Sequence, residues 1–182
     1  MNGRGTIAVQ LTDAPFPTDS VKSVDIFVVR VEGRVADVDE ASADQNVTSE
    51  DSSHTDGWKT LATPNASIDL LALQNGVTSA LGEAKVDTAS YRGFRLIIDP
   101  SKSSVTLKDG QTLTSTSSPS VAFPSASRSG IKIDLSAPIQ VSAGGKATLV
   151  VDFDVGNSFV MRGNSLSKNG LLFKPVIHGS VK

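Results

Sequence analysis

The sequence predicts an all-β protein, an antiparallel β-sandwich of roughly eight to ten strands in the style of transthyretin-like or immunoglobulin-like domains. Three observations support this prediction. Apolar and polar residues alternate with a period of two through most of the apolar segments. Turn-forming pairs such as Asp99-Pro100 and Asp109-Gly110 separate these segments. Helical periodicity is confined to one short stretch near residues 69–75.

The first strand is predicted at TIAVQLT, where Ile7, Val9 and Leu11 share one face. The second, VDIFVVRVEGRV, is apolar on both faces and is therefore expected to lie at the centre of a sheet. Its two faces are Phe27, Val29 and Val31 on one side, and Val24, Ile26 and Val28 on the other. The later strands are predicted, in order, at WKTL, YRGFRLII, SVTL, GIKIDL, IQV, KATLVVDFDV and LLFKPVIHGSV.

Three residues are predicted to hold local structure together. Asp69 caps the short helix over residues 69–75, which ends at Asn75-Gly76. Tyr91 follows a turn and precedes a strand, which predicts a tyrosine corner whose hydroxyl group bonds to upstream backbone. Asp13, before Ala14-Pro15, predicts a structural turn.

Two segments interrupt the strands of what we expect to be a single domain over residues 1–182. Residues 36–57 carry seven acids and neither lysine nor arginine, which predicts a flexible acidic insertion between two strands. The stretch STSSPSVAFPSASRSG predicts a surface loop that Val121 and Phe123 attach to the core.

Composition excludes several classes of protein and site. With 38% hydrophobic and 20% charged residues and a net charge of −2, the chain is typical of a globular domain. It has no basic stripe and only scattered aromatic residues, so no nucleic-acid partner is expected. The absence of cysteine excludes disulfides and thiolate metal sites. No apolar run is long enough to span a membrane.

Asp152 and Asp154 are the candidate site residues. They lie two residues apart in TLVVDFDVGNSFV and would share a strand face, opposite Leu149, Val151 and Phe153. One interpretation is that these carboxylates accept backbone hydrogen bonds and tie a strand end to a nearby loop. The alternative is that Asp152 and Asp154 bind calcium, for which carboxylates and backbone carbonyls suffice.

No motif specifies a reaction, and we expect a protein that is not an enzyme. There is no Gly-x-Ser-x-Gly elbow, and His54 and His178 are too few for a zinc site. Paired carboxylates such as Asp152 and Asp154 hydrolyse glycosides in some enzymes, so a hydrolase remains an alternative. The large polar aromatic residues that would surround a sugar are limited to Trp58 and Tyr91.

Several segments together resemble a known family. In order, they are GTIAVQLTDAPFP, GWKTL, IDLLALQNG, YRGFRLII, SGIKIDL, VVDFDVGNSFV and LLFKPVI. They resemble the bacterial and archaeal domain of unknown function numbered 4382, which occurs in predicted lipoproteins and other exported proteins. The resemblance covers nearly the whole chain and implies an exported, transthyretin-like β-sandwich, with no catalytic residues to carry over. The turn before Tyr91 departs from the family pattern, because it reads DTAS without the usual glycine.

These observations lead to an expected role. We expect a non-enzymatic cell-surface or periplasmic module that binds a protein or a glycan, or that serves as a structural spacer. Because the first strand begins almost at Met1, a signal peptide or a lipid-anchored cysteine is expected upstream. The alternative is a self-assembling filament or adhesin subunit, whose N-terminal strand TIAVQLT is an unpaired edge filled by a neighbouring chain.

Overall fold

The computed structural model describes residues 3–13, 19–35, 58–73, 77–123 and 130–182. The described strands form a sheet of twelve strands and a separate sheet of three, which confirms the all-β prediction. The large sheet contains β1 (Arg4–Asp13), β2 (Val21–Val35), β3 (Trp58–Ala62), β4 (Ala66–Asp69), β5 (Ser79–Asp87), β6 (Ser90–Ile98), β7 (Ser104–Leu107), β8 (Thr112–Thr114), β10 (Ile131–Leu135), β11 (Ile139–Gln140), β12 (Lys146–Phe153) and β15 (Ile177–Val181). The small sheet contains β9 (Val121–Ala122), β13 (Phe159–Met161) and β14 (Leu171–Phe173). The helical turns are η1 (Leu70–Leu73), η2 (Pro100–Lys102), α2 (Val155–Ser158) and α3 (Leu166–Asn169).

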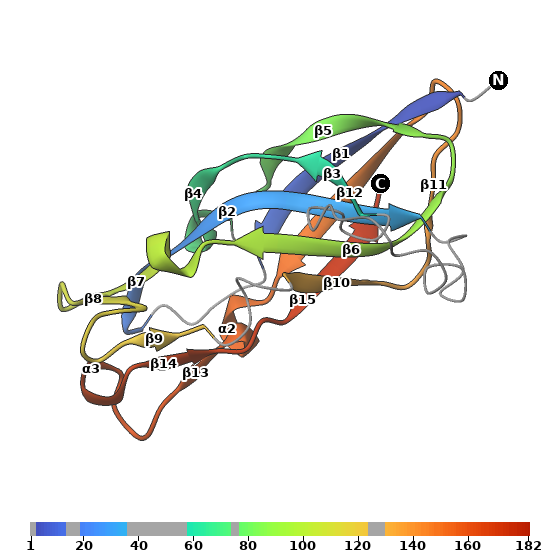
Figure 1. Ribbon diagram of the computed structural model, residues 1–182. Coiled ribbons are helices and arrows are strands. Elements are labelled where there is room, and N and C mark those ends of the chain that lie inside the picture. The colour runs from blue at the N-terminus through green and yellow to red at the C-terminus, as the bar shows by residue number, and fades with distance from the viewer. Residues whose placement is uncertain (1–2, 14–18, 36–57, 74–76, 124–129) are drawn as a thin grey trace, which may run out of the picture.

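The large sheet folds over into two layers, as a sandwich does (Figure 1). One layer has the order β5-β1-β12-β15, and the other the order β10-β6-β2-β7-β8, with β3 and β4 also paired to β2 and β11 to β6. The pairing of β10 with β15 joins the layers. At the opposite side β5 comes close to β3, because a Cβ atom on Gly82 would lie 3.2 Å from the Cβ atom of Ala62.

Most of the described strand pairs are antiparallel, in agreement with the predicted antiparallel β-sandwich. Three pairs are parallel, namely β1 with β12, β10 with β15, and β14 with β9. The prediction that the N-terminal strand is an unpaired edge is wrong, since β1 hydrogen-bonds to β12 on one side and to β5 on the other. A neighbouring chain therefore has no open edge to fill at TIAVQLT.

The central position predicted for the second strand is confirmed, because β2 pairs with β6 and β7 as well as with β3 and β4. The side chains of β2 do not alternate strictly between the two faces of the sheet. The register with β6 shifts between Val28 and Arg30, so one extra residue is inserted at Val29. As a result Val31 is fully buried, as Val24, Ile26 and Val28 are, while Phe27 is only partly buried.

The predicted local anchors are present. The carboxylate of Asp69 accepts hydrogen bonds from the backbone N–H groups of Leu71 (3.1 Å) and Val24 (3.2 Å), at the start of the short helix η1. The tyrosine corner is confirmed, because the buried Tyr91 hydroxyl donates to the carbonyl of Asp87 at 3.0 Å. The corner therefore forms without the family's glycine in the preceding turn.

The segment predicted as a serine-rich surface loop contains the short strand β9, so that prediction is only partly right. Its attachment to the core is confirmed. Val121 is fully buried, and the Phe123 ring lies 5.2 Å from that of Phe173, measured between centroids. Phe173 also contacts Phe153 and Phe159, so this aromatic cluster joins the small sheet to the main core.

Some predictions fall outside the described residues. They are the acidic insertion at residues 36–57, the end of the predicted helix at residues 74–76, and the residues that follow Asp13. Within the described part of the chain, no helix is long and apolar enough to cross a membrane.

Candidate functional site

Asp154, one of the two predicted site residues, is the N-cap of α2. Strand β12 ends at Phe153, and the side chain of Asp154 accepts a hydrogen bond from the backbone N–H of Asn157 at 3.1 Å. Its second carboxylate oxygen accepts a bond from the Asn157 side-chain amide at 2.7 Å. The carboxylate thus ties a strand end to the following turn, as one interpretation of the sequence proposed.

Asp152 lies inside β12, beside Thr12 of β1 and His178 of β15 in the strand register. One oxygen of its carboxylate is buried and has no hydrogen-bond partner. Such an orphaned acceptor is compatible with a bound cation. Among the described residues, however, no group of three or more His, Cys, Asp or Glu side chains could hold a metal ion. A calcium site at Asp152 and Asp154 therefore remains a prediction.

The row Thr12, Asp152 and His178 has the residue types of a nucleophile, an acid and a base. The Thr12 hydroxyl group is within hydrogen-bond reach of two backbone carbonyls, those of Val77 (3.0 Å) and Leu73 (3.4 Å). Its proton is therefore directed to backbone. His178 is exposed, and His54 lies outside the described residues. The row offers no activated nucleophile.

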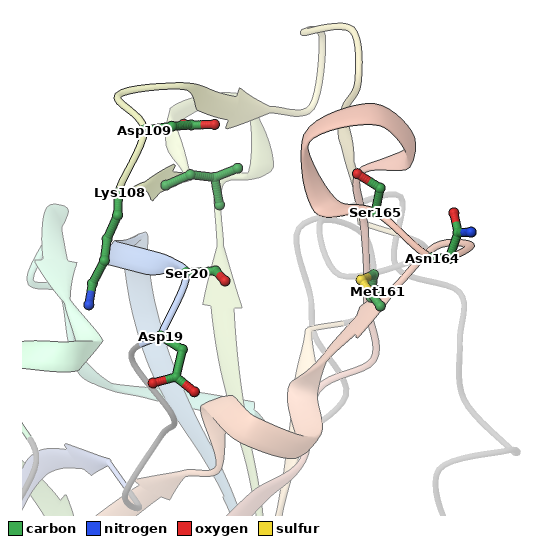
Figure 2. Close-up of a pocket in the computed structure, with 8 residues that line it drawn as sticks. Asp19, Ser20, Lys108, Asp109, Met161, Asn164 and Ser165 are labelled. Carbon is green, nitrogen blue, oxygen red and sulfur yellow. The ribbon is translucent and has the colours of Figure 1, made fainter.

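A cavity of about 460 Å³ lies where loops of the large sheet meet the small sheet. We call it the loop-end pocket. Figure 2 shows two groups of side chains facing each other across it, one from the start of β2 and the β7–β8 turn, the other from β13 and the turn after it. The pocket is lined by Asp19, Ser20, Leu107, Lys108, Asp109, Met161, Asn164 and Ser165.

Backbone hydrogen bonds position the first of these groups. The Lys108 N–H donates to the Ser20 carbonyl at 3.0 Å, which fixes the β7–β8 turn beside the start of β2. One oxygen of the Asp109 carboxylate accepts a hydrogen bond from the Gln111 N–H at 2.8 Å, which fixes this carboxylate at the turn. Asp19 supplies a second carboxylate at the opposite end of this group (Figure 2).

The facing group combines polar and apolar surface. Met161 is 46% exposed, although it is one of the large apolar side chains of the molecule. Asn164 and Ser165 add an amide and a hydroxyl group beside it. The pocket can therefore accept and donate hydrogen bonds at several points and pack an apolar surface against the thioether of Met161.

A second cavity, of about 420 Å³, lies between residues 117–120 and the α3 turn. Its lining includes Arg162 and Lys168 among serine and asparagine side chains, but no large apolar side chain such as Met161. It lacks the mixed polar and apolar lining of the loop-end pocket, which is the combination usual in ligand sites.

The sequence predicted Asp109-Gly110 only as a turn. Nothing in the sequence places this turn beside Asn164, because the two are far apart in the chain and only the tertiary structure makes them neighbours. Turns and polar residues at exposed ends of strands were the available signal.

Comparison with protein families matches residues 4–175 to the family described as domain of unknown function (DUF4382). Comparison with curated proteins finds no match, and comparison with solved structures finds none either.

Proposed function

Because the chain belongs to the family of domain of unknown function DUF4382, whose description names no activity, we propose a function from the site itself. The protein is a non-enzymatic binding module of an exported protein, acting at the cell surface or in the periplasm. Its ligand is a neutral glycan, bound in the loop-end pocket.

The observation that carries this proposal is the lining of the loop-end pocket. Sugars present many hydroxyl groups. The carboxylates of Asp19 and Asp109 can accept hydrogen bonds from them, and the amide of Asn164 can either accept or donate such bonds. The apolar C–H face of a sugar ring can pack on Met161. A cavity of about 460 Å³ also falls within the range usual for small-ligand sites.

The position in the fold supports the same function. Binding residues of β-sandwich proteins are commonly carried by loops gathered at one end of the sandwich, on a rigid scaffold. A hydrolase centred on Asp152 and Asp154 receives no such support, because both oxygens of Asp154 are bonded to Asn157.

Binding of the purified protein to an array of neutral oligosaccharides, including β-glucan, mannan, xylan and chitin fragments, tests the proposal. Affinity for a ligand found there is then measured by calorimetry for Asp19→Ala and Asn164→Ala. Loss of a hydrogen bond to the charged Asp19 should weaken binding by about tenfold or more, and loss of one to the neutral amide of Asn164 by about twofold to tenfold. Glu83→Ala, an exposed carboxylate on β5, is the matched control and should bind as the unchanged protein does. Equal affinities in all four proteins would refute the assignment of the pocket.

Export is tested separately by fractionating cells of the native organism and locating the protein with an antibody. The proposal expects it in the periplasm or on the surface, sensitive to added protease after the outer layers are opened. A protein confined to the cytosolic fraction would contradict it.

A second candidate is self-assembly through the small sheet. In the described part of the chain β13 is an edge strand paired only to β14, and its Val160 and Met161 are 45% and 46% exposed. Light scattering at high protein concentration distinguishes this role. Oligomers that dissociate in the Val160→Lys variant would support self-assembly, and a protein that is monomeric at every concentration would exclude it.

A further inference from the structure

A second feature, remote in sequence from the loop-end pocket, is a group of cations on the outer face of strands β3, β2, β6 and β10. On β2, Val31 and Gly33 point into the core, so Arg30, Glu32 and Arg34 share the outer face. The register places Arg95 of β6 directly beside Glu32, and Lys132 of β10 directly beside Arg95. We call Arg30, Arg34, Arg95 and Lys132 the cationic face.

A buried carboxylate organises this face. Glu32 is only 4% exposed, and it accepts hydrogen bonds from the Nε atoms of Arg30 (2.7 Å) and Arg95 (2.5 Å). Burial alone would raise the pKa of Glu32, but the hydrogen bonds and charges of the two arginines outweigh burial and lower it. Each guanidinium group has five N–H donors, and these bonds use only the one on Nε. Each of these bonds leaves the four terminal N–H donors of its guanidinium group for other partners.

Trp58 fixes the plane of one guanidinium group. The Cζ atom of Arg95 lies 4.3 Å from the centroid of the Trp58 ring, which is the geometry of a cation–π contact. Gly93 lies against the ring, where a Cβ atom would be in ordinary van der Waals contact with the Cη2 atom at 3.4 Å. The arginine is thus held by Glu32 at its edge and by Trp58 on its face.

The charge of this face differs from that of the chain. Four cations, those of Arg30, Arg34, Arg95 and Lys132, gather around Glu32 on this part of the sheet, whereas the whole chain has a net charge of −2. Arg30 and Arg95 balance the charge of the buried Glu32, and Arg34 and Lys132 add further positive charge to the same rigid sheet. This positive charge is suited to an anionic partner.

From this arrangement we infer that the cationic face binds an acidic polysaccharide, a linear glycan that carries carboxylates at regular intervals. Guanidinium groups pair with carboxylates through two parallel hydrogen bonds, and an array fixed in advance loses little entropy on binding. Arg95 and Lys132 are directly beside each other on neighbouring strands, about 4.8 Å apart, and Arg30 and Arg34 are four residues, about 13–14 Å, apart along β2, so one extended polymer can contact several of them. Because the Trp58 ring is already stacked on Arg95, the described face offers no series of aromatic rings for nucleobases.

This inference is independent of the proposed function, since it concerns another ligand and another surface. The experiment is calorimetric titration of the full chain with polygalacturonate at low and at physiological salt. Neutral dextran and single-stranded DNA of similar length are titrated in parallel.

The variant that tests the face is Arg34→Gln with Lys132→Gln, which removes two charges and leaves the Glu32 ion pair untouched. Its matched control is Lys22→Gln with Lys85→Gln, the same change of charge at exposed positions on the far part of β2 and on β5. We expect at least about tenfold weaker binding for the first and less than about twofold change for the second, with affinity falling as salt rises. Unchanged melting temperatures show that both remain folded.

Three results would overturn the inference. They are no binding of polygalacturonate at low salt, equal losses in the two double variants, and binding of the DNA that is as tight as that of polygalacturonate. The pocket variant Asn164→Ala should leave the affinity for polygalacturonate unchanged. A failure of the cationic-face inference can therefore be distinguished from a failure of the neutral-glycan proposal.

Discussion

Replacing Glu32 with glutamine should destabilise the protein more than any change at an exposed ion pair. Glutamine has nearly the same shape and keeps one acceptor oxygen for Arg30 or Arg95. Its amino group then faces the other Nε–H, donor against donor, and the carboxylate charge that balances both arginines is gone.

The magnitude follows from the exposure of the partners. Each hydrogen bond to a charged group contributes about 1.5–3 kcal/mol when it is buried. The Arg95 side chain is 16% exposed, so its bond should contribute within that range. The Arg30 side chain is 37% exposed, and screening by water reduces its contribution to about 1 kcal/mol or less. We therefore expect a loss of about 2–4 kcal/mol in the free energy of unfolding.

The assay is urea unfolding followed by circular dichroism, together with thermal melting. For a chain of this size each kcal/mol lowers the melting temperature by about 2–4 °C, so a fall of about 6–12 °C is expected for a loss of 3 kcal/mol. Glu83→Gln is the matched control. Glu83 pairs with Lys146 at 2.8 Å, but their side chains are 57% and 58% exposed, so its loss should cost less than about 1 kcal/mol.

The pH dependence provides a second readout. Because the folded state lowers the pKa of Glu32 below its ordinary value of 4.5, its contribution is present above that value and is lost as pH falls through the lowered pKa. The gap in stability between the unchanged protein and Glu32→Gln should narrow in acid. If Glu32→Gln were as stable as Glu83→Gln at neutral pH, the buried ion pair would not have the strength that this reasoning gives it.

Three other changes test individual contacts. Asp154→Ala removes the N-cap of α2 and the bond to Asn157, and should cost about 1 kcal/mol by urea unfolding; a loss below the error of the assay would mean that the cap contributes nothing. Tyr91→Phe deletes the hydroxyl bond to the Asp87 carbonyl and should cost about 1 kcal/mol or more, since that carbonyl loses a buried partner; an unchanged urea midpoint would show that the corner is dispensable. The calcium site predicted at Asp152 and Asp154 requires a higher melting temperature in calcium than in chelator. When calcium exceeds the dissociation constant about a hundredfold, the free energy of unfolding should rise by about 2.7 kcal/mol, and equal melting curves would reject a tight site.

The all-β class could be predicted because period-two alternation and turn residues are local signals. The anchoring roles of Asp69 and Tyr91 could be predicted for the same reason. Asp69 bonds to backbone two residues away and Tyr91 to backbone four residues away. Strand direction and neighbours could not be predicted. Nothing within TIAVQLT indicates that β1 lies parallel to β12, more than a hundred residues later in the chain.

The site residues show the same division. The role of Asp154 as a helix cap could be predicted from the sequence, because its partner Asn157 is only three residues away. The bulge at Val29 shifted Val31 to the core face, so strict alternation assigned it wrongly. Glu32 lies in an apolar strand, where its two arginine partners are recognisable only once β6 is placed beside β2. The loop-end pocket likewise depends on turns that tertiary structure alone brings together.

The most direct test of binding at the loop-end pocket is a nuclear magnetic resonance titration of the isotope-labelled protein with the neutral oligosaccharide that binds best on the array. Binding in the pocket predicts that the amide signals that shift belong to residues 19–20, 107–109 and 161–165, and that Asn164→Ala reduces these shifts at equal ligand concentration. Shifts centred on other strands, or none at a saturating concentration, would contradict it.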